Sequence, residues 1–150
     1  MPEVSIIIPT YNRADLVGRA IKSVLNQTFQ DFEIIVVNNY SKDNTLNIIS
    51  SFNDSRIKII DFQNNGVIAK SRNKGLMKST GKYIAFLDDD DAWEPGKLER
   101  NIGILKTSSN LVGAVYTGMI LLNHKEEVIK EIIPRYRGNI LNSLLIKNHI

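Results

Sequence analysis

The feature that most constrains the fold of this chain is a regular alternation between short apolar runs and segments with helical periodicity. Apolar runs lie at residues 4–8, 33–37, 56–60 and 82–87, and polar residues follow each of them. Runs of about five residues are typical of strands buried in a parallel sheet. The alternation therefore predicts an α/β fold with a mostly parallel sheet, flanked by helices and joined by right-handed crossovers. The first helical segment shows the periodicity in Leu16, Val17, Ala20, Ile21, Val24 and Leu25.

Local signals predict where the first elements begin and end. Pro9 is expected to end the first strand, and Asn12 is expected to cap the helix that follows it. Ser41 or Asp43 is expected to cap the second helix. The run at 56–60 alternates enough to predict a strand nearer the edge of the sheet.

Glycine and proline mark the next two helices. The turn signal Asn64-Asn65-Gly66 precedes a helix expected from about residue 67 to residue 78, which Gly81 is expected to close. Pro95 is expected in the first turn of the helix after the fourth strand.

The pattern changes beyond residue 110. Apolar runs at 111–122 and 128–133 flank a polar turn, which predicts a C-terminal β-hairpin. Residues 140–145 predict a short helix near the chain end. A length of 150 residues fits one domain, so we expect residues 1–150 to form a single domain. Because the last helix is apolar up to Ile150, we expect further chain to follow it.

A run of four carboxylates, Asp88 to Asp91, directly follows the apolar residues 83–87. Adjacent carboxylates repel one another and attract a cation, and Mg²⁺ and Mn²⁺ prefer oxygen ligands. A solvated acidic loop is the alternative, since most charge runs are solvated. The position of this run, between a buried strand and a helix start, favours a divalent metal site.

Three predicted strand ends carry polar or aromatic residues that a ligand could contact. They are Pro9-Thr10-Tyr11, Asn38-Asn39 and the acidic run. The carboxyl ends of parallel strands share one edge of a sheet, where ligands of open α/β sheets bind. A base could stack on Tyr11 and hydrogen-bond to an Asn side chain, while a metal held the phosphates. The alternatives are that Tyr11 is a packing residue and that Asn38-Asn39 caps the next helix.

Composition narrows the class of protein. The net charge is +3 with the basic residues dispersed, so we do not expect nucleic-acid binding. The absence of cysteine excludes disulfides and suits a reducing compartment. No apolar run approaches the roughly 18 residues that cross a membrane, and Pro2-Glu3 and Pro9 interrupt any signal peptide.

Other nucleotide-binding signatures are missing from the sequence. Neither G-x-G-x-x-G after the first strand nor G-x-x-x-x-G-K-[ST] occurs. An aspartyl nucleophile for phosphoryl transfer at Asp88 is a further alternative, but that motif resembles D-x-D-x-T, and Ala92 stands at the Thr position.

Several segments together resemble the family 2 glycosyltransferases, which have the GT-A fold. The resemblance runs in order from about residue 4 to residue 105, and no single segment is specific alone. The matching segments are V-S-I-I-I-P-T-Y-N-R at 4–13, S-V-L-N-Q-T at 23–28, E-I-I-V-V at 33–37, N-G at 65–66, S-R-N-K-G at 71–75 and G-K-Y-I-A-F-L-D-D-D-D at 81–91.

The resemblance implies an inverting transfer of a sugar from a nucleotide-diphosphate donor, often a UDP-sugar, with Mn²⁺ or Mg²⁺ at a D-x-D pair. Asp88 and Asp90 match that pair, with Asp90 expected to contact the metal directly. A family carboxylate takes the proton of the acceptor hydroxyl. The positions that match nucleotide-binding residues of the family are Pro9, Thr10, Tyr11, Asn39, Arg72, Asp88 and Asp89.

The sequence departs from the family in two respects. Asn38-Asn39-Tyr40-Ser41 replaces the usual D-D-G-S, so a neutral amide stands where a carboxylate accepts the N–H of the base, at a cost of about 1 kcal/mol. Tyr40 in place of Gly is expected to crowd the turn. The family's catalytic base lies beyond the matched region, so we expect it to follow Ile150. We expect this chain to bind donor but to transfer sugar poorly by itself.

The resemblance also implies partners. Acceptors in this family include polysaccharides and lipid-linked intermediates, so envelope glycan assembly in the cytoplasm, at the inner face of the membrane, is expected for the whole protein. A non-catalytic nucleotide-sugar-binding module on the same fold is the second hypothesis, because Asn38-Asn39 replaces the acidic pair and no base is identified.

Overall fold

A computed structural model describes residues 1–109, 112–136 and 138–139 of the chain. The chain divides into two compact units, residues 1–100 and residues 101–150.

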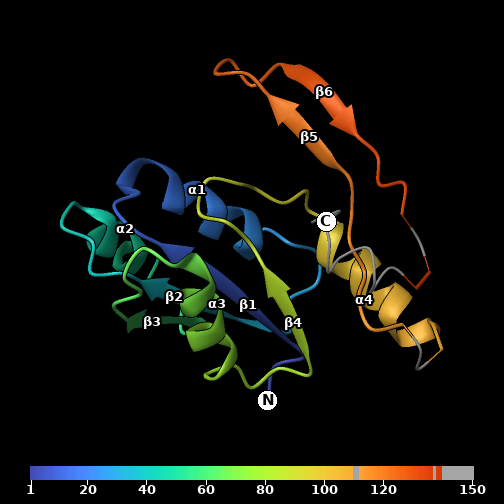
Figure 1. Cartoon of the computed structure of the whole chain (residues 1–150), viewed down its shortest axis with the longest axis horizontal. Helices are drawn as coiled ribbons and strands as arrows, with labels where there is room; N and C mark the ends of the chain where they lie inside the picture. Colours follow the sequence, from blue (N-terminus) through green and yellow to red (C-terminus); the bar gives the residue numbers. More distant parts are fainter. Residues whose placement is uncertain (110–111, 137, 140–150) are drawn as a thin grey trace. The chain divides into compact units, whose positions relative to one another are not determined.

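A four-stranded parallel sheet forms the centre of the first unit (Figure 1). Its order is β3-β2-β1-β4, and the two central strands are completely buried. The predicted parallel sheet is confirmed, and so is the edge position of the third strand. The strands are β1 (Val4–Thr10), β2 (Phe32–Asn38), β3 (Ile57–Asp61) and β4 (Tyr83–Phe86).

Helices cover both faces of this sheet (Figure 1). α1 (Ala14–Leu25) and α2 (Thr45–Ser51) pack together on one face, and α3 (Ile68–Leu76) lies on the other. The connections from β1 to β2 and from β2 to β3 run in one direction, whereas the connection from β3 to β4 runs back. Right-handed crossovers therefore place α3 on the opposite face. The reversal makes β1 and β4 the switch point, where α/β sheets bind ligands.

Close packing of α3 depends on a glycine. A Cβ atom at Gly75 would lie 2.5 Å from Cγ2 of Ile7 in β1, so only a residue without a side chain allows this approach. The helix α1 buries Val17, Ala20, Ile21 and Val24 along one stripe, as its periodicity predicts.

The structure corrects three predicted element ends. β1 continues through Pro9 to Thr10. Asn12 does not cap α1, because the N-cap is Arg13 and no side chain caps it locally. α3 ends at Leu76, so Gly81 does not close it. Instead, a Cβ atom at Gly81 would lie 2.6 Å from the backbone nitrogen of Ser5, which makes Gly81 a close-approach residue before β4.

The fourth predicted helix and strand also differ. Pro95 precedes the helix α4 (Lys97–Thr107) and does not lie in its first turn. β4 is the other edge of the sheet and is only partly buried, with Phe86 49% exposed, because it pairs with β1 alone.

A buried carboxylate, Glu33, ties the strands together. It accepts hydrogen bonds from the hydroxyl of Ser5 in β1 (2.6 Å) and from the ammonium of Lys58 in β3 (2.6 Å). It also accepts from the backbone N–H and the hydroxyl of Thr80, both at 2.8 Å. Burial alone would raise the pKa of Glu33, but these bonds lower it from 4.5 to about 2.

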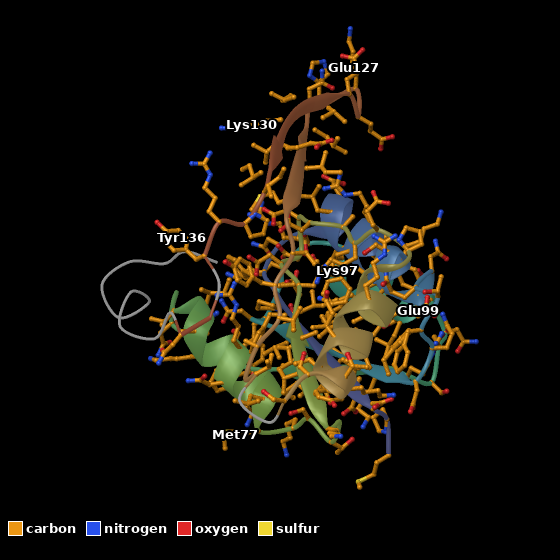
Figure 2. The ribbon with its side chains drawn as sticks, turned by 90° about the vertical axis from the view of Figure 1, so that its right-hand side faces the viewer. Met77, Lys97, Glu99, Glu127, Lys130 and Tyr136 are labelled. Atoms are coloured by element: carbon orange, nitrogen blue, oxygen red, sulfur yellow. The ribbon has the colours of Figure 1, made fainter. Side chains whose placement is uncertain are left out.

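The described part of the second unit contains the predicted hairpin. β5 (Met119–Leu122) pairs antiparallel with β6 (Val128–Ile132), and both strands are exposed along their length. The first arm is shorter than the predicted run at 111–122. Glu127 and Lys130 project from this hairpin into solvent (Figure 2). The predicted helix from residue 140 lies outside the described residues.

Within the described ranges, no helix combines the length and the apolar composition that a bilayer crossing requires.

Candidate functional site

Two cavities open at the carboxyl ends of β1 and β2, and Tyr11 and Asn39 line both. The smaller has a volume of about 240 Å³ and the larger about 390 Å³. The smaller is lined by Pro9, Thr10, Tyr11, Arg13, Asn39, Asn64, Gly66, Ile68 and Asp89. The larger is lined by Tyr11, Asn39, Tyr40, Lys42, Gln63 and Asn65.

The loops that follow β1 and β2 are joined by hydrogen bonds. The backbone N–H of Asn39 donates to the carbonyl of Thr10 (2.9 Å), and that of Asn12 donates to the hydroxyl of Ser41 (2.9 Å). The backbone N–H of Lys42 donates to Oδ1 of Asn12 (2.8 Å). Between these bonds lie Tyr11 and Tyr40, whose side chains are 50% and 57% exposed. The two rings are therefore carried on a backbone that is held in place.

The segment that follows β2 also supplies hydrogen-bond acceptors for the first N–H groups of α1. The backbone N–H of Arg13 donates to Oγ1 of Thr45 (2.9 Å), and that of Ala14 donates to Oδ2 of Asp43 (3.1 Å). Asp43 accepts from the N–H of Thr45 at the start of α2 as well (3.0 Å). The N-cap of α2 is Asn44, so neither Ser41 nor Asp43 caps this helix as predicted. The carboxylate of Asp43 nevertheless accepts the N–H of the first residue of each helix, Ala14 in α1 and Thr45 in α2.

The two adjacent asparagines have different roles. Asn38 is completely buried, and its Nδ2 donates to Oδ1 of Asp61 at 2.6 Å. Its Oδ1 accepts from the N–H and the hydroxyl of Ser41. Asn39 is partly exposed, lines both cavities and accepts the backbone N–H of Asn64 through Oδ1 (2.9 Å). Asn38 therefore holds the loop, and Asn39 faces the space that a ligand could occupy.

Tyr40 adopts a left-handed backbone conformation, with φ of 54°. This conformation costs a residue with a Cβ atom about 1–2 kcal/mol, which explains why glycine suits such a position. The expected crowding at this turn therefore takes the form of backbone strain. Asn65 and Gly66 are left-handed as well, as the turn signal predicts.

Asp89 is the buried member of the acidic run. It is 9% exposed, lines the smaller cavity and lies 3.6 Å from Nε of Arg13. Burial raises its pKa, while the neighbouring Thr10 hydroxyl and Arg13 act in the opposite direction. Thr10 is 4% exposed, and its Oγ1 lies near the Asp89 carboxylate but forms no hydrogen bond of ordinary geometry with any described residue.

Asp88 forms an ion pair with Arg72. Nη2 of Arg72 donates to Oδ1 of Asp88 at 2.6 Å, and Nε of Arg72 is buried without a partner among the described residues. The structure thus brings together two residues that were predicted from separate motifs. Arg72 bonds to Oδ1 of Asp88, and no described residue bonds to Oδ2.

Asp90 and Asp91 are exposed. The pKa of Asp91 is raised, because neighbouring atoms partly shield its carboxylate from water and the charges of Asp90 and Asp88 repel its ionised form. The carbonyl of Asp90 accepts a hydrogen bond from Arg19. In the described part of the chain, no three carboxylates or imidazoles converge to enclose a metal. Two carboxylates still fit Mg²⁺ or Mn²⁺ chemistry, because such ions commonly take one or two carboxylates and complete their shell with phosphate oxygens and water.

Most of the predicted site residues gather around the two cavities. Pro9, Thr10, Tyr11, Asn39 and Asp89 line them, whereas Arg72, Asp88 and Asp90 are not among the lining residues.

Sequence reasoning missed several lining residues. Arg13, Asn65 and Gly66 stand within the quoted motifs, and position in those motifs was the available signal. Tyr40 was noted only as a departure from the family. The other missed residues are Lys42, Gln63, Asn64 and Ile68, and no signal in the sequence marked Lys42 or Gln63.

Comparison with known proteins extends these observations. The chain is 39% identical over 136 residues to an uncharacterized glycosyltransferase of Rickettsia prowazekii, covering 91% of this chain and 42% of that protein. It is 36% identical over 145 residues to the Escherichia coli protein WfgD, named a UDP-Glc:alpha-D-GlcNAc-diphosphoundecaprenol beta-1,3-glucosyltransferase, covering 97% of this chain and 55% of WfgD. The chain therefore spans about half the length of these relatives.

Solved structures agree on the fold. The structure of S. aureus TarS residues 1–349 matches with a TM-score of 0.66 at 30% identity, covering 69% of this chain and 32% of TarS. The mannosyltransferase PcManGT from Pyrobaculum calidifontis matches with a TM-score of 0.70 at 24% identity, covering 77% of this chain and 35% of that one. The predicted α/β fold of GT-A type is confirmed. A family model described as glycosyl transferase family 2 matches residues 5–148, and this chain belongs to that family.

Proposed function

We propose that this chain binds the nucleotide-diphosphate sugar donor of a glycosyltransferase, with a UDP-sugar as the donor. The observation that carries the proposal is the convergence of Pro9, Thr10, Tyr11, Asn39 and Asp89 around cavities at one edge of the sheet. WfgD, which is named for a UDP-glucose donor and a lipid-linked acceptor, supports this donor class and a glycan or lipid-linked acceptor.

Different residues would bind different parts of the donor. The exposed rings of Tyr11 and Tyr40 offer faces on which the base stacks. Arg13, which lines the smaller cavity, and Arg72, which is paired with Asp88, supply positive charge to the diphosphate. The unpartnered hydroxyl of Thr10 forms a further hydrogen bond with the donor.

Asp88 and Asp90 would hold Mg²⁺ or Mn²⁺, which neutralises the negative charge that develops on the diphosphate as the sugar leaves. One oxygen of Asp88 is engaged by Arg72, so Asp90 is the better ligand of the two. In the part of the chain that the structure describes we assign no general base for the acceptor hydroxyl, and we propose that the whole protein acts in the cytoplasm, at the inner face of the membrane.

Calorimetric titration of the chain with UDP, with and without Mn²⁺, tests this proposal. We expect binding that strengthens at least about tenfold with Mn²⁺, and we expect Asp90→Ala to remove that gain. Asp31→Ala is the matched control, because it deletes an exposed carboxylate just before β2, at the amino ends of the strands and away from the cavities. Failure of the wild-type chain to bind any nucleoside diphosphate would contradict the proposal.

A non-catalytic module is the second candidate, favoured by the neutral side chain of Asn39 at the cavity. A donor-hydrolysis assay on a longer chain separates the two functions. Metal-dependent turnover of the donor supports the enzyme, and binding without turnover supports the module.

A further inference from the structure

The orientation of the Asn39 side chain is set by its neighbour. Oδ1 of Asn39 accepts the backbone N–H of Asn64 at 2.9 Å. Asn64 is itself fixed, because it is 8% exposed, its Nδ2 donates to Ser71 (2.9 Å) and its Oδ1 accepts the N–H of Gly66 (2.8 Å). A flipped amide would set the NH₂ group of Asn39 against that N–H. The carbonyl oxygen of Asn39 therefore stays on Asn64.

The group of Asn39 that remains available is a donor. No described residue accepts a hydrogen bond from its Nδ2, and the side chain lines both cavities. An amide NH₂ group carries two N–H donors and has no acceptor capacity. A ligand in these cavities thus meets a fixed donor at a position where a carboxylate would present an acceptor.

Uracil and cytosine differ at this point. Uracil carries an N3–H donor between two carbonyl oxygens, whereas N3 of cytosine is an acceptor beside the O2 carbonyl. An NH₂ group pairs with the carbonyl oxygens of either base and with N3 of cytosine, but it cannot accept the N3–H of uracil.

The other lining groups do not select between the two bases. Stacking on Tyr11 and Tyr40 tolerates any base, because every base has a π-face. Gln63 is exposed and has no partner among the described residues, so its amide can turn either polarity toward a ligand. Arg13 and Lys42 carry only donors, so neither accepts the N3–H of uracil. Among the uncharged lining side chains, Asn39 is the one whose available group has a fixed polarity.

We propose that Asn39 reads a pyrimidine base through the acceptor atoms of its edge, so that this site accepts CDP about as well as UDP. This inference rests on the proposed function, which supplies the pyrimidine nucleoside diphosphate. It goes further by assigning the base selectivity to one side chain and by naming cytidine nucleotides as ligands.

Asn39→Asp is a nearly isosteric test. The variant keeps an oxygen for the N–H of Asn64 and replaces the NH₂ group with a second acceptor. The control is Asn44→Asp, which adds the same charge at an exposed residue at the start of α2 that lines neither cavity. Calorimetric titration of each full chain with UDP and with CDP, at one Mn²⁺ concentration, gives the ratio of the two dissociation constants.

We expect the wild-type constants to agree within about threefold, and we expect Asn39→Asp to shift the ratio toward UDP by about tenfold or more. Asn44→Asp should leave the ratio unchanged. A wild-type preference for UDP above about tenfold would overturn the inference, even if the variant did not fold, and would leave the proposed function standing. Binding of neither nucleotide would overturn both.

Discussion

At the residue scale, the end of β2 shows how two identical side chains take different roles. Asn38 is buried and donates to the carboxylate of Asp61, whereas Asn39 lies at the cavities. The sequence alone could treat them only as a pair. The roles of the two asparagines differ because their side chains point to different sides of the chain and because Asn38 meets Asp61 of β3. Since β3 is distant in the sequence, this contact could not be predicted.

Asn38→Asp should destabilise the fold. The new carboxylate would face that of Asp61 in place of a 2.6 Å hydrogen bond, at a cost of about 1–3 kcal/mol. Urea denaturation at pH 7 measures the loss. Asn44→Asp is the control, because this exposed residue at the start of α2 tolerates a negative charge. An unchanged free energy of unfolding for Asn38→Asp would show that the hydrogen bond to Asp61 contributes nothing.

Tyr40→Asn should separate stability from binding. Asparagine tolerates the left-handed conformation at φ of 54°, so stability should rise by up to about 1 kcal/mol. Loss of the ring should weaken UDP binding by about tenfold, since stacking contributes about 1–3 kcal/mol per base. Thermal unfolding and calorimetry measure the two effects. Tyr40→Phe retains the ring and should retain affinity, and equal losses in both variants would argue against stacking.

At the scale of elements, the sequence predicted what is encoded locally. The four strands and their parallel order follow from apolar runs and right-handed crossovers. The start of α1 could not be predicted, because its N–H groups bond to Asp43 and Thr45, about thirty residues away. The Glu33 network escaped prediction for the same reason, since its partners come from β1, β3 and the turn at Thr80.

Glu33 should make the free energy of unfolding depend on pH in the acid range. Its pKa falls from 4.5 to about 2 on folding, so its contribution is complete above about pH 4.5 and is lost as the pH falls toward 2. The shift corresponds to about 3 kcal/mol. Glu33→Gln should lose about 2–3 kcal/mol at pH 7 and show a flatter pH profile in this window. Chemical denaturation at several pH values measures both. The exposed Glu131→Gln is the control, and an identical profile for Glu33→Gln and wild type would refute the role of this carboxylate.

At the scale of the whole molecule, the proposed nucleotide site is confined to one unit. The residues that line both cavities fall between Pro9 and Asp89, within residues 1–100. The hairpin β5–β6 is exposed on both strands, and two-stranded hairpins alone are marginally stable. Family membership followed from motifs in order along the sequence, whereas the full catalytic apparatus did not, because the chain spans about half the length of its relatives.

A chain that ends at Ser109 should therefore bind UDP with an affinity within about threefold of the 150-residue chain, because no lining residue is removed. Calorimetry with Mn²⁺ compares the two, and circular dichroism establishes that the shorter chain folds. A folded but non-binding chain would show that residues after Ser109 contribute to the site.

The loop after β2 serves two neighbours at once, since Asp43 and Thr45 receive the first amides of α1 while Asn39 and Tyr40 face the cavities. We therefore expect donor binding at the cavities to reduce the motion of this loop and, through these hydrogen bonds, to slow the local opening of the start of α1. Hydrogen–deuterium exchange should report it: saturating UDP should slow exchange at the amides of Arg13 and Ala14, although neither amide needs to touch the nucleotide. If UDP leaves the exchange rates of these two amides unchanged, the start of α1 is not coupled to nucleotide binding.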